Sequence, residues 1–214
     1  GIDVSVWNGD VDWPRVKAQG IDFAMIRSSY GWYDEYDAAA GKEYNFQYDK
    51  KLQRNVKGAI DNDIQFGIYH YSYADTLQKA DQEADYIIQI LDEYASAYKD
   101  KMTLPVAYDV EEKKQKVIGK AALTNIVIRF CSRLYEAGYT PIIYANKEWL
   151  TKYININNVS NYKVWLAHYV KETSYEGDYT MWQTGSIGRI DGCDEDVDTD
   201  ILFKSRYPEL FGGT

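Results

Sequence analysis

Residues 104–112 read Leu-Pro-Val-Ala-Tyr-Asp-Val-Glu-Glu, an apolar run that ends in acidic side chains and has the character of a buried β-strand. Side chains alternate between the faces of a strand and rise ~3.3 Å per residue, so Asp109 and Glu111 share a face about 6.6 Å apart at the backbone. Ala107 precedes them on that face. Burying two carboxylates without a function would be costly. The spacing therefore favours two acids that act on one bond, and the alternative is a strand end whose acids meet solvent.

The segments around this run alternate between strand-like and helix-like patterns, which predicts a parallel sheet with crossover helices. The helix expected over 13–19 has a proline in its first turn and ends before a glycine, and the one over 76–98 carries apolar residues at helical spacing. Two further helices are expected over 48–62 and 125–137. The strands are expected at 2–6, 23–28, 65–71, 104–110 and 141–145.

The pattern changes after Trp149. Strand-like segments at 163–169, 179–183 and 196–202 follow one another at intervals of about ten residues, whereas a parallel crossover needs a dozen or more. We therefore expect these strands to be antiparallel. The predicted fold is an α/β, irregular (β/α) barrel of about five parallel strands with helices followed by three antiparallel strands, because 214 residues are few for a regular barrel of ~250. Residues 1–214 are expected to form one domain, since no linker composition divides them.

The composition excludes several classes of function. A net charge of −9 and a pI near 4.8 argue against nucleic acid as a partner, and no apolar run approaches the ~20 residues that span a membrane. Cys131 and Cys193 are too few for a disulfide framework, although one bridge stays open. His70 and His168 lack the spacing of zinc ligands, and the acidic stretch 191–200 lacks the pattern of a calcium loop. No metal and no cofactor are therefore expected.

Polar and aromatic residues stand near the ends of several predicted strands. In barrels with parallel strands the active site lies at the carboxyl ends of those strands, so these side chains are expected to converge. A positioned pair of carboxylates is the usual equipment for glycoside hydrolysis, and the separation of the two groups decides between retention and inversion. The backbone spacing does not choose between these outcomes. The residues at the strand ends are Asp3 with Ser5, Tyr69 with Tyr71 or His70, Asp109 with Glu111, and Tyr144 with Asn146.

A series of short motifs, in order along nearly the whole chain, resembles glycoside hydrolase family 25, the Chalaropsis-type lysozymes or N-acetylmuramidases. The strand 104–111 resembles the family's Asp-x-Glu block. The other blocks are Gly1-Ile2-Asp3-Val4-Ser5 with Trp7-Asn8-Gly9 and Asp12-Trp13, then Ser28-Ser29-Tyr30-Gly31, the run 67–74, Glu83-Ala84, Gly138-Tyr139 with Pro141 and Ile143-Tyr144-Ala145-Asn146, Trp165-Leu166-Ala167 with Tyr169, Trp182-Gln183 and Val197-Asp198.

The resemblance implies hydrolysis, with retention, of the β-1,4 bond between N-acetylmuramic acid and N-acetylglucosamine in bacterial peptidoglycan. It implies that Glu111 is the general acid/base. Asp109 is either a nucleophile or the stabiliser of attack by the substrate's own 2-acetamido group, and the second role is favoured. Asp3 and Asp198 match two further acidic positions of the family's site. The residues assigned to substrate binding are Tyr69, Tyr71, Tyr108, Tyr144, Asn146, Trp165, Trp182 and Gln183.

Two features depart from the family pattern. Many members have Asn where this chain has Asp200, which adds a negative charge if the side chain faces the mouth and does nothing if it points outward. The acidic segment 32–44 is longer than the motif requires, and it either shapes substrate preference or is a solvated loop.

The resemblance also implies a partner and a location. Glycan strands of peptidoglycan are the expected partner, with no nucleic acid and no membrane insertion, for a monomer that is secreted or associated with the cell wall. No signal peptide precedes Gly1. The alternative function is a non-catalytic peptidoglycan-binding module on the same barrel. A hydrolase of amide or peptide bonds is disfavoured, because that chemistry usually needs zinc or a Cys/His pair.

Overall fold

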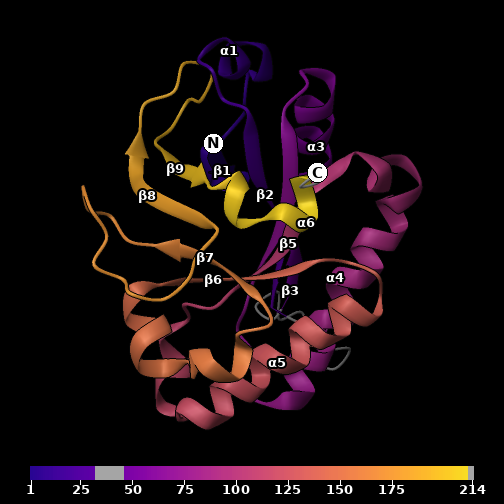
Figure 1. Cartoon of the computed structure of the whole chain (residues 1–214). Coiled ribbons are helices and arrows are strands. Elements are labelled where there is room, and N and C mark those ends of the chain that lie inside the picture. Colours follow the sequence, from indigo (N-terminus) through magenta and orange to yellow (C-terminus); the bar gives the residue numbers. More distant parts are fainter. Residues whose placement is uncertain (32–45, 212–214) are drawn as a thin grey trace.

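The computed structural model describes residues 1–31 and 46–211, whose path is drawn in Figure 1. The segment 32–44, singled out in the sequence for its acidity, lies outside the described residues. No described helix is both long enough and apolar enough to cross a bilayer.

Nine strands of the described residues form one sheet that closes on itself. The order around the sheet is β1-β9-β8-β7-β6-β5-β4-β2-β3, and a further pairing of β1 with β2 completes the ring, so that β3 extends the sheet beside β2. The predicted irregular α/β barrel is confirmed. The strands are β1 (Ile2–Val4), β2 (Phe23–Gly31), β3 (Phe46–Tyr48), β4 (Gln65–Tyr71), β5 (Met102–Asp109), β6 (Pro141–Asn146), β7 (Lys163–Ala167), β8 (Met181–Gly188) and β9 (Val197–Leu202).

The prediction of three antiparallel strands at the end of the chain is wrong in detail. β7 pairs parallel to β6 and β8 pairs parallel to β7, whereas β9 runs antiparallel to both β8 and β1. The connection of residues 168–180 contains no helix, yet it is long enough to return the chain to the same end of the sheet. The spacing in the sequence underestimated the length of this connection, because β8 begins at Met181, later than expected.

The helices cover the outside of the barrel. α4 and α5 pack against each other and over the sheet, as the ribbon in Figure 1 shows. α1 begins where the sequence predicts, with the Asp12 carboxylate accepting the backbone N–H of Arg15 at 3.2 Å. The α-helices are α1 (Trp13–Ala18), α3 (Leu52–Asp61), α4 (Leu77–Tyr98), α5 (Lys120–Glu136) and α6 (Pro208–Phe211). Shorter helical turns are Val6–Asn8, Lys99–Lys101, Lys113–Val117, Trp149–Tyr153, Ile156–Val159 and Lys204–Arg206.

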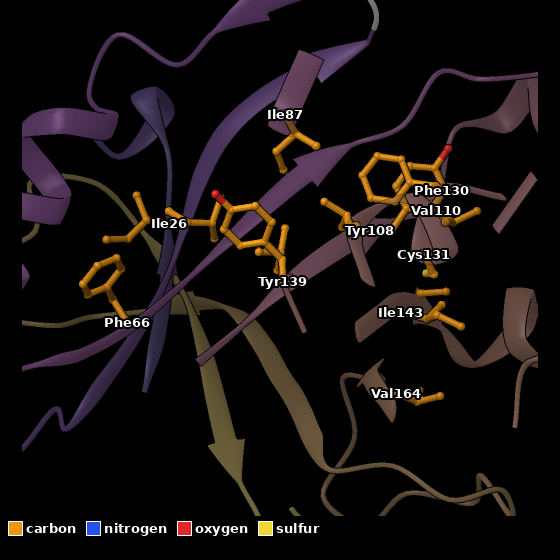
Figure 2. Close-up of a cluster of buried hydrophobic side chains, with 14 of the residues drawn as sticks. Ile26, Phe66, Ile87, Tyr108, Val110, Phe130, Cys131, Tyr139, Ile143 and Val164 are labelled. Carbon is orange, nitrogen blue, oxygen red and sulfur yellow. The ribbon is translucent and has the colours of Figure 1, made fainter. Parts of the chain in front are cut away.

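The alternation of side chains along each strand divides the core into two layers. Outward-facing residues pack against the helices. The ring of Phe130 of α5 stacks on that of Tyr108, and both belong with Ile87 of α4 and Val110 to one buried cluster (Figure 2). Inward-facing residues such as Met25 fill the barrel itself. At the amino ends of the strands the barrel interior is apolar, whereas towards their carboxyl ends it becomes polar. The polar end is where the candidate site lies.

Candidate active site

A cavity of about 310 Å³ opens at the carboxyl ends of the barrel strands. Its walls come from inward-facing positions of strands and from the turns that follow them. All four predicted catalytic acids line it, together with five of the eight predicted substrate-binding residues. The lining residues are Asp3, Ser5, Trp7, Asn8, Arg27, Tyr69, Tyr71, Asp109, Glu111, Tyr144, Trp165, Gln183 and Asp198.

Asp109 is the last residue of β5 and lies between Tyr71 of β4 and Tyr144 of β6. The backbone N–H of Ser72 donates to the Asp109 carbonyl at 2.9 Å, which fixes this strand end. The Asp109 side chain is buried, and its Oδ1 has no hydrogen-bond partner in the described part of the chain. Glu111 follows two residues later and is partly open to solvent. One acid is therefore deep and the other accessible.

Burial raises the pKa of Asp109 well above its ordinary value, and the negative charge of Glu111 adds to this effect. The pKa of Glu111 is also raised, by burial first and then by the charges of Asp198 and Glu112. Of the groups around Asp109, Arg27 acts in the opposite direction. Because the charge of Glu111 adds to the cost of ionising the buried Asp109, the two acids do not both ionise easily. The pair is therefore able to hold a proton at a pH where an exposed carboxyl group would have lost it.

A second group of acids lies across the cavity. Asp3 of β1 and Asp198 of β9 are register partners, and the Gln183 side-chain amide donates to both, at 2.7 Å and 3.3 Å. The pKa of Asp3 is raised well above its ordinary value by burial and by the charges of Asp200 and Asp198. Asp200 points inward, accepts the indole N–H of Trp165 at 2.8 Å and has its pKa raised by burial to about 7. The added acid thus faces the barrel interior, next to Asp3.

Gln183 also joins the acids to the aromatic wall. Its Oε1 accepts the hydroxyl groups of Tyr144 at 2.8 Å and Tyr169 at 2.7 Å. With its amide N–H groups on Asp3 and Asp198, this one side chain fixes both walls of the cavity. Tyr144 packs against Trp165 with ring centroids 4.6 Å apart, which adds a rigid apolar surface of the kind that sugar faces contact.

Asn146 lies in an adjoining cavity of about 620 Å³, which shares Glu111 and Tyr144 with the first. Its side-chain Oδ1 accepts the backbone N–H of Trp149 at 3.1 Å. Lys147 and Lys152 line the same space. The two cavities meet at Glu111, so together they form an elongated depression that passes this acid.

Two residues assigned to substrate binding lie elsewhere. Tyr108 faces the helices, because it alternates with Asp109: it is fully buried, and its ring stacks on Phe130 at a centroid distance of 3.7 Å. Trp182 alternates with Gln183 in the same way, packs against the outer core and donates its indole N–H to the carbonyl of His168 at 2.9 Å. Neither ring lines the cavity, since strand periodicity puts both behind its wall.

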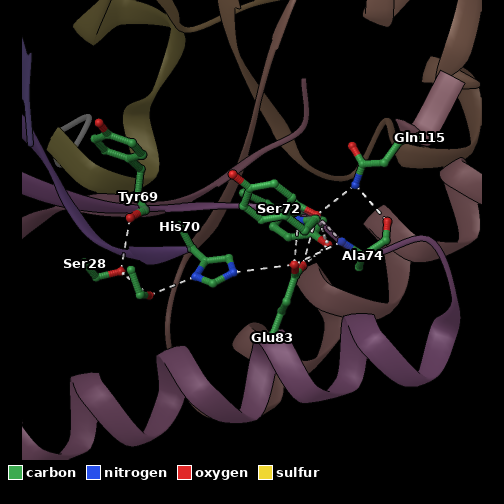
Figure 3. Close-up of polar contacts among 10 residues, drawn as sticks. Ser28, Tyr69, His70, Ser72, Ala74, Glu83 and Gln115 are labelled. Carbon is green, nitrogen blue, oxygen red and sulfur yellow. Dashed lines mark hydrogen bonds and ion pairs between the residues drawn. The ribbon is translucent and has the colours of Figure 1, made fainter. Parts of the chain in front are cut away.

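A buried polar network supports this part of the barrel from outside (Figure 3). The Glu83 carboxylate of α4 accepts the hydroxyl groups of Tyr108 at 2.7 Å and Ser72 at 3.0 Å, and also the backbone N–H of Tyr73 at 2.7 Å. His70, considered as a mouth residue, belongs here: it faces outward, with Nδ1 2.8 Å from the Ser29 hydroxyl. The network ties α4 to the ends of β4 and β5, and so to the backbone that carries Asp109.

Sequence reasoning missed Arg27, Trp7 and Asn8 as cavity residues. Arg27 shares the inward face of β2 with the buried Met25, two residues before it, and this spacing was the available signal. Trp7 lies at the rim of the cavity and is 78 % exposed. The sequence showed this residue only as part of a motif. Across the described ranges 1–31 and 46–211, no cluster of three or more His, Cys, Asp or Glu side chains is arranged to hold a metal ion.

Comparisons with known proteins bear on the family and the fold. The family model of glycosyl hydrolases family 25 matches residues 2–193. Lysozyme M1 of Streptomyces globisporus is 26 % identical over 210 residues, which are 92 % of this chain and 65 % of that protein. The chain thus spans 65 % of the length of this curated relative.

Solved structures share the fold. The CTP1L endolysin superposes with a TM-score of 0.80 at 21 % identity, covering 100 % of this chain and 69 % of that one. A family 25 glycosyl hydrolase from Bacillus anthracis gives a TM-score of 0.77 at 21 % identity, with coverages of 100 % and 93 %. At these identities the likeness concerns the fold.

Proposed function

Because the chain belongs to glycosyl hydrolases family 25, we propose that it is a lysozyme that hydrolyses the β-1,4 bond between N-acetylmuramic acid and N-acetylglucosamine in bacterial peptidoglycan. The observation that carries the proposal is the meeting of Asp109 and Glu111 with Asp3 and Asp198 in one cavity at the mouth of the barrel. Paired carboxyl groups in an aromatic-walled cavity are what the hydrolysis of a glycosidic bond requires.

In this mechanism Glu111 gives its proton to the glycosidic oxygen as the bond breaks, and in the second step it takes a proton from the attacking water. Its raised pKa, caused by burial and by Asp198 and Glu112, keeps the proton available. Its partial exposure lets a leaving sugar reach it. Glu111 also lines both cavities, so a glycan strand that occupies them passes this residue.

Asp109 acts on the other side of the reacting carbon. It either bonds to that carbon, or it orients the 2-acetamido group of the substrate and stabilises the positive charge that develops on it. We favour the second role, because the carboxyl is buried at the strand end and the free Oδ1 is suited to accept an amide N–H. Both routes retain the anomeric configuration, so the first reducing ends formed should be β in an early NMR spectrum.

The experiment that tests the function is digestion of purified peptidoglycan, followed by reduction and mass spectrometry of the fragments. New reducing ends at muramic acid are expected. Reducing ends at glucosamine, or free peptides with intact glycan, would overturn the proposal. Binding to the glycan without any cleavage would instead identify a non-catalytic module.

We further propose that residues 1–214 act as one catalytic domain, since β1 and β9 close the same barrel. Its partner is the glycan strand, and it works as a monomer outside the cell or at the cell wall, where that polymer lies. Gel filtration with light scattering, and fractionation of the cells that make the protein, test these points.

A further inference from the structure

Arg27 is the one cationic side chain among the described residues that line the cavity, and four acids line it as well. Its side chain is 10 % exposed, and its Nε donates to the Asp49 carboxylate at 2.9 Å. Asp49 is itself fully buried and also accepts the backbone N–H groups of Val6 and Lys51, each at 2.9 Å. The guanidinium group is thus fixed from one side by a rigid partner.

The two terminal nitrogens of this guanidinium have no hydrogen-bond partner in the described part of the chain, since the Asp49 contact uses Nε. A buried guanidinium with unused donors favours a ligand that brings oxygen acceptors, and its planar fork matches a carboxylate. Its charge also reaches the centre of the site, because it lowers the pKa of Asp109 against the effects of burial and of Glu111. Arg27 therefore presents a positive charge to whatever occupies the cavity.

The proposed reaction determines what that occupant is. Cleavage at the anomeric carbon of N-acetylmuramic acid puts the muramic ring against Asp109. This ring carries a lactyl ether whose carboxyl group forms an amide with the stem peptide and is free where that peptide has been removed. A free carboxylate entering a cavity lined by Asp3, Asp109, Glu111 and Asp198 would be repelled unless a cation meets it. The lysines of the adjoining cavity are less suited, since Lys152 pairs with Glu148 and Lys147 bonds to Ser174.

We propose that Arg27 forms a subsite for the free lactyl carboxylate of those N-acetylmuramic acid residues that carry no stem peptide. The inference rests on the proposed function and deepens it: the guanidinium binds the substituent that distinguishes muramic acid from glucosamine. Asp49 then acts as a positioning residue, because it holds the guanidinium in place through Nε.

The test compares two substrates: glycan strands freed of peptides, which carry free lactyl carboxylates, and the same strands methyl-esterified at those groups. For the wild type, esterification should lower kcat/KM about 10- to 100-fold, the range for one hydrogen bond to a charged group. Arg27→Gln should cut the acid strands more slowly by a similar factor and lose the preference for them, whereas Arg27→Lys should keep part of it. Arg54→Gln, which removes an exposed arginine paired with Asp10, should behave like the wild type.

If Arg27→Gln lowered kcat/KM by the same factor on acid and on esterified strands, the subsite would be overturned and the loss would point to a contact with a neutral group. If the Gln variant fails to fold, the wild type alone decides, because an unchanged kcat/KM after esterification also refutes the proposal. Should the wild type cut neither substrate, the proposed function fails first. The affinities of Glu111→Gln and Glu111→Gln/Arg27→Gln for the two glycans, measured by calorimetry, then still test whether Arg27 binds the carboxylate.

Discussion

Asp200→Asn should stabilise the protein above about pH 4, and the gain should reach its full size above about pH 7. Asp200 is buried beside Asp3, and burial raises its pKa from 3.8 to about 7. In the unfolded chain this carboxyl loses its proton near pH 4, whereas in the folded protein it keeps the proton until about pH 7, so the folded state loses stability as pH rises between these values. At 1.36 kcal/mol per pKa unit, a shift of about three units corresponds to about 4 kcal/mol.

Asparagine removes this penalty while its carbonyl oxygen still accepts the Trp165 N–H that Asp200 now accepts. Urea unfolding of both proteins at pH 4 and pH 8 measures the difference. The free energies of unfolding should be similar at pH 4, and the variant should be more stable at pH 8 by up to about 4 kcal/mol. The gain is smaller if the neighbouring Asp3 holds the proton in place of Asp200, because the two carboxyl groups titrate together. If the free energies of unfolding of the two proteins changed by the same amount between pH 4 and pH 8, the reasoning would be refuted.

Three further results are expected. Glu111→Gln should lower kcat on peptidoglycan by about 10²- to 10⁴-fold, as for loss of a general acid, while the affinity for glycan stays near that of the wild type; near-normal turnover would remove Glu111 from the role. Asp198→Asn should move the alkaline limb of the pH–rate profile to lower pH, because the charge of Asp198 raises the pKa of Glu111; a limb that stays in place would contradict this link. Tyr108→Phe should cost about 1–3 kcal/mol of stability in a urea titration, since Glu83 loses a buried donor, yet it should leave KM unchanged because Tyr108 faces the helices.

The sequence predicted most of the barrel, because its strands are short apolar runs with period two. β4 was predicted with its observed bounds, and β5 to within two residues. β3 was not predicted: it has three residues and pairs with β2 at the edge of the sheet, so it is too short for a pattern of period two. The parallel pairing of β8 was missed because an irregular connection, unlike a helix, has no periodic signal.

For the site, the acids were easier to place than the rings. Asp109 and Glu111 were found from one strand, but the pairing of Asp3 with Asp198 depends on barrel closure, which local sequence does not encode. Tyr108 and Trp182 lie outside the cavity, and the sequence did not show this because an aromatic residue next to a catalytic position looks the same whichever face of the strand it occupies. Arg27 was overlooked because its role depends on Asp49, which lies beyond the next strand.

The pairing of β1 with β9 has a consequence for how the enzyme is made. Asp3 and Asp198 stand opposite each other although the whole chain between them must be synthesised first. Contacts of such large sequence separation form late and slow the folding of a domain. A ribosome that has released β1 to β8 therefore holds a chain without a complete acid cluster. We expect hydrolytic activity only once the last strand has left the ribosome.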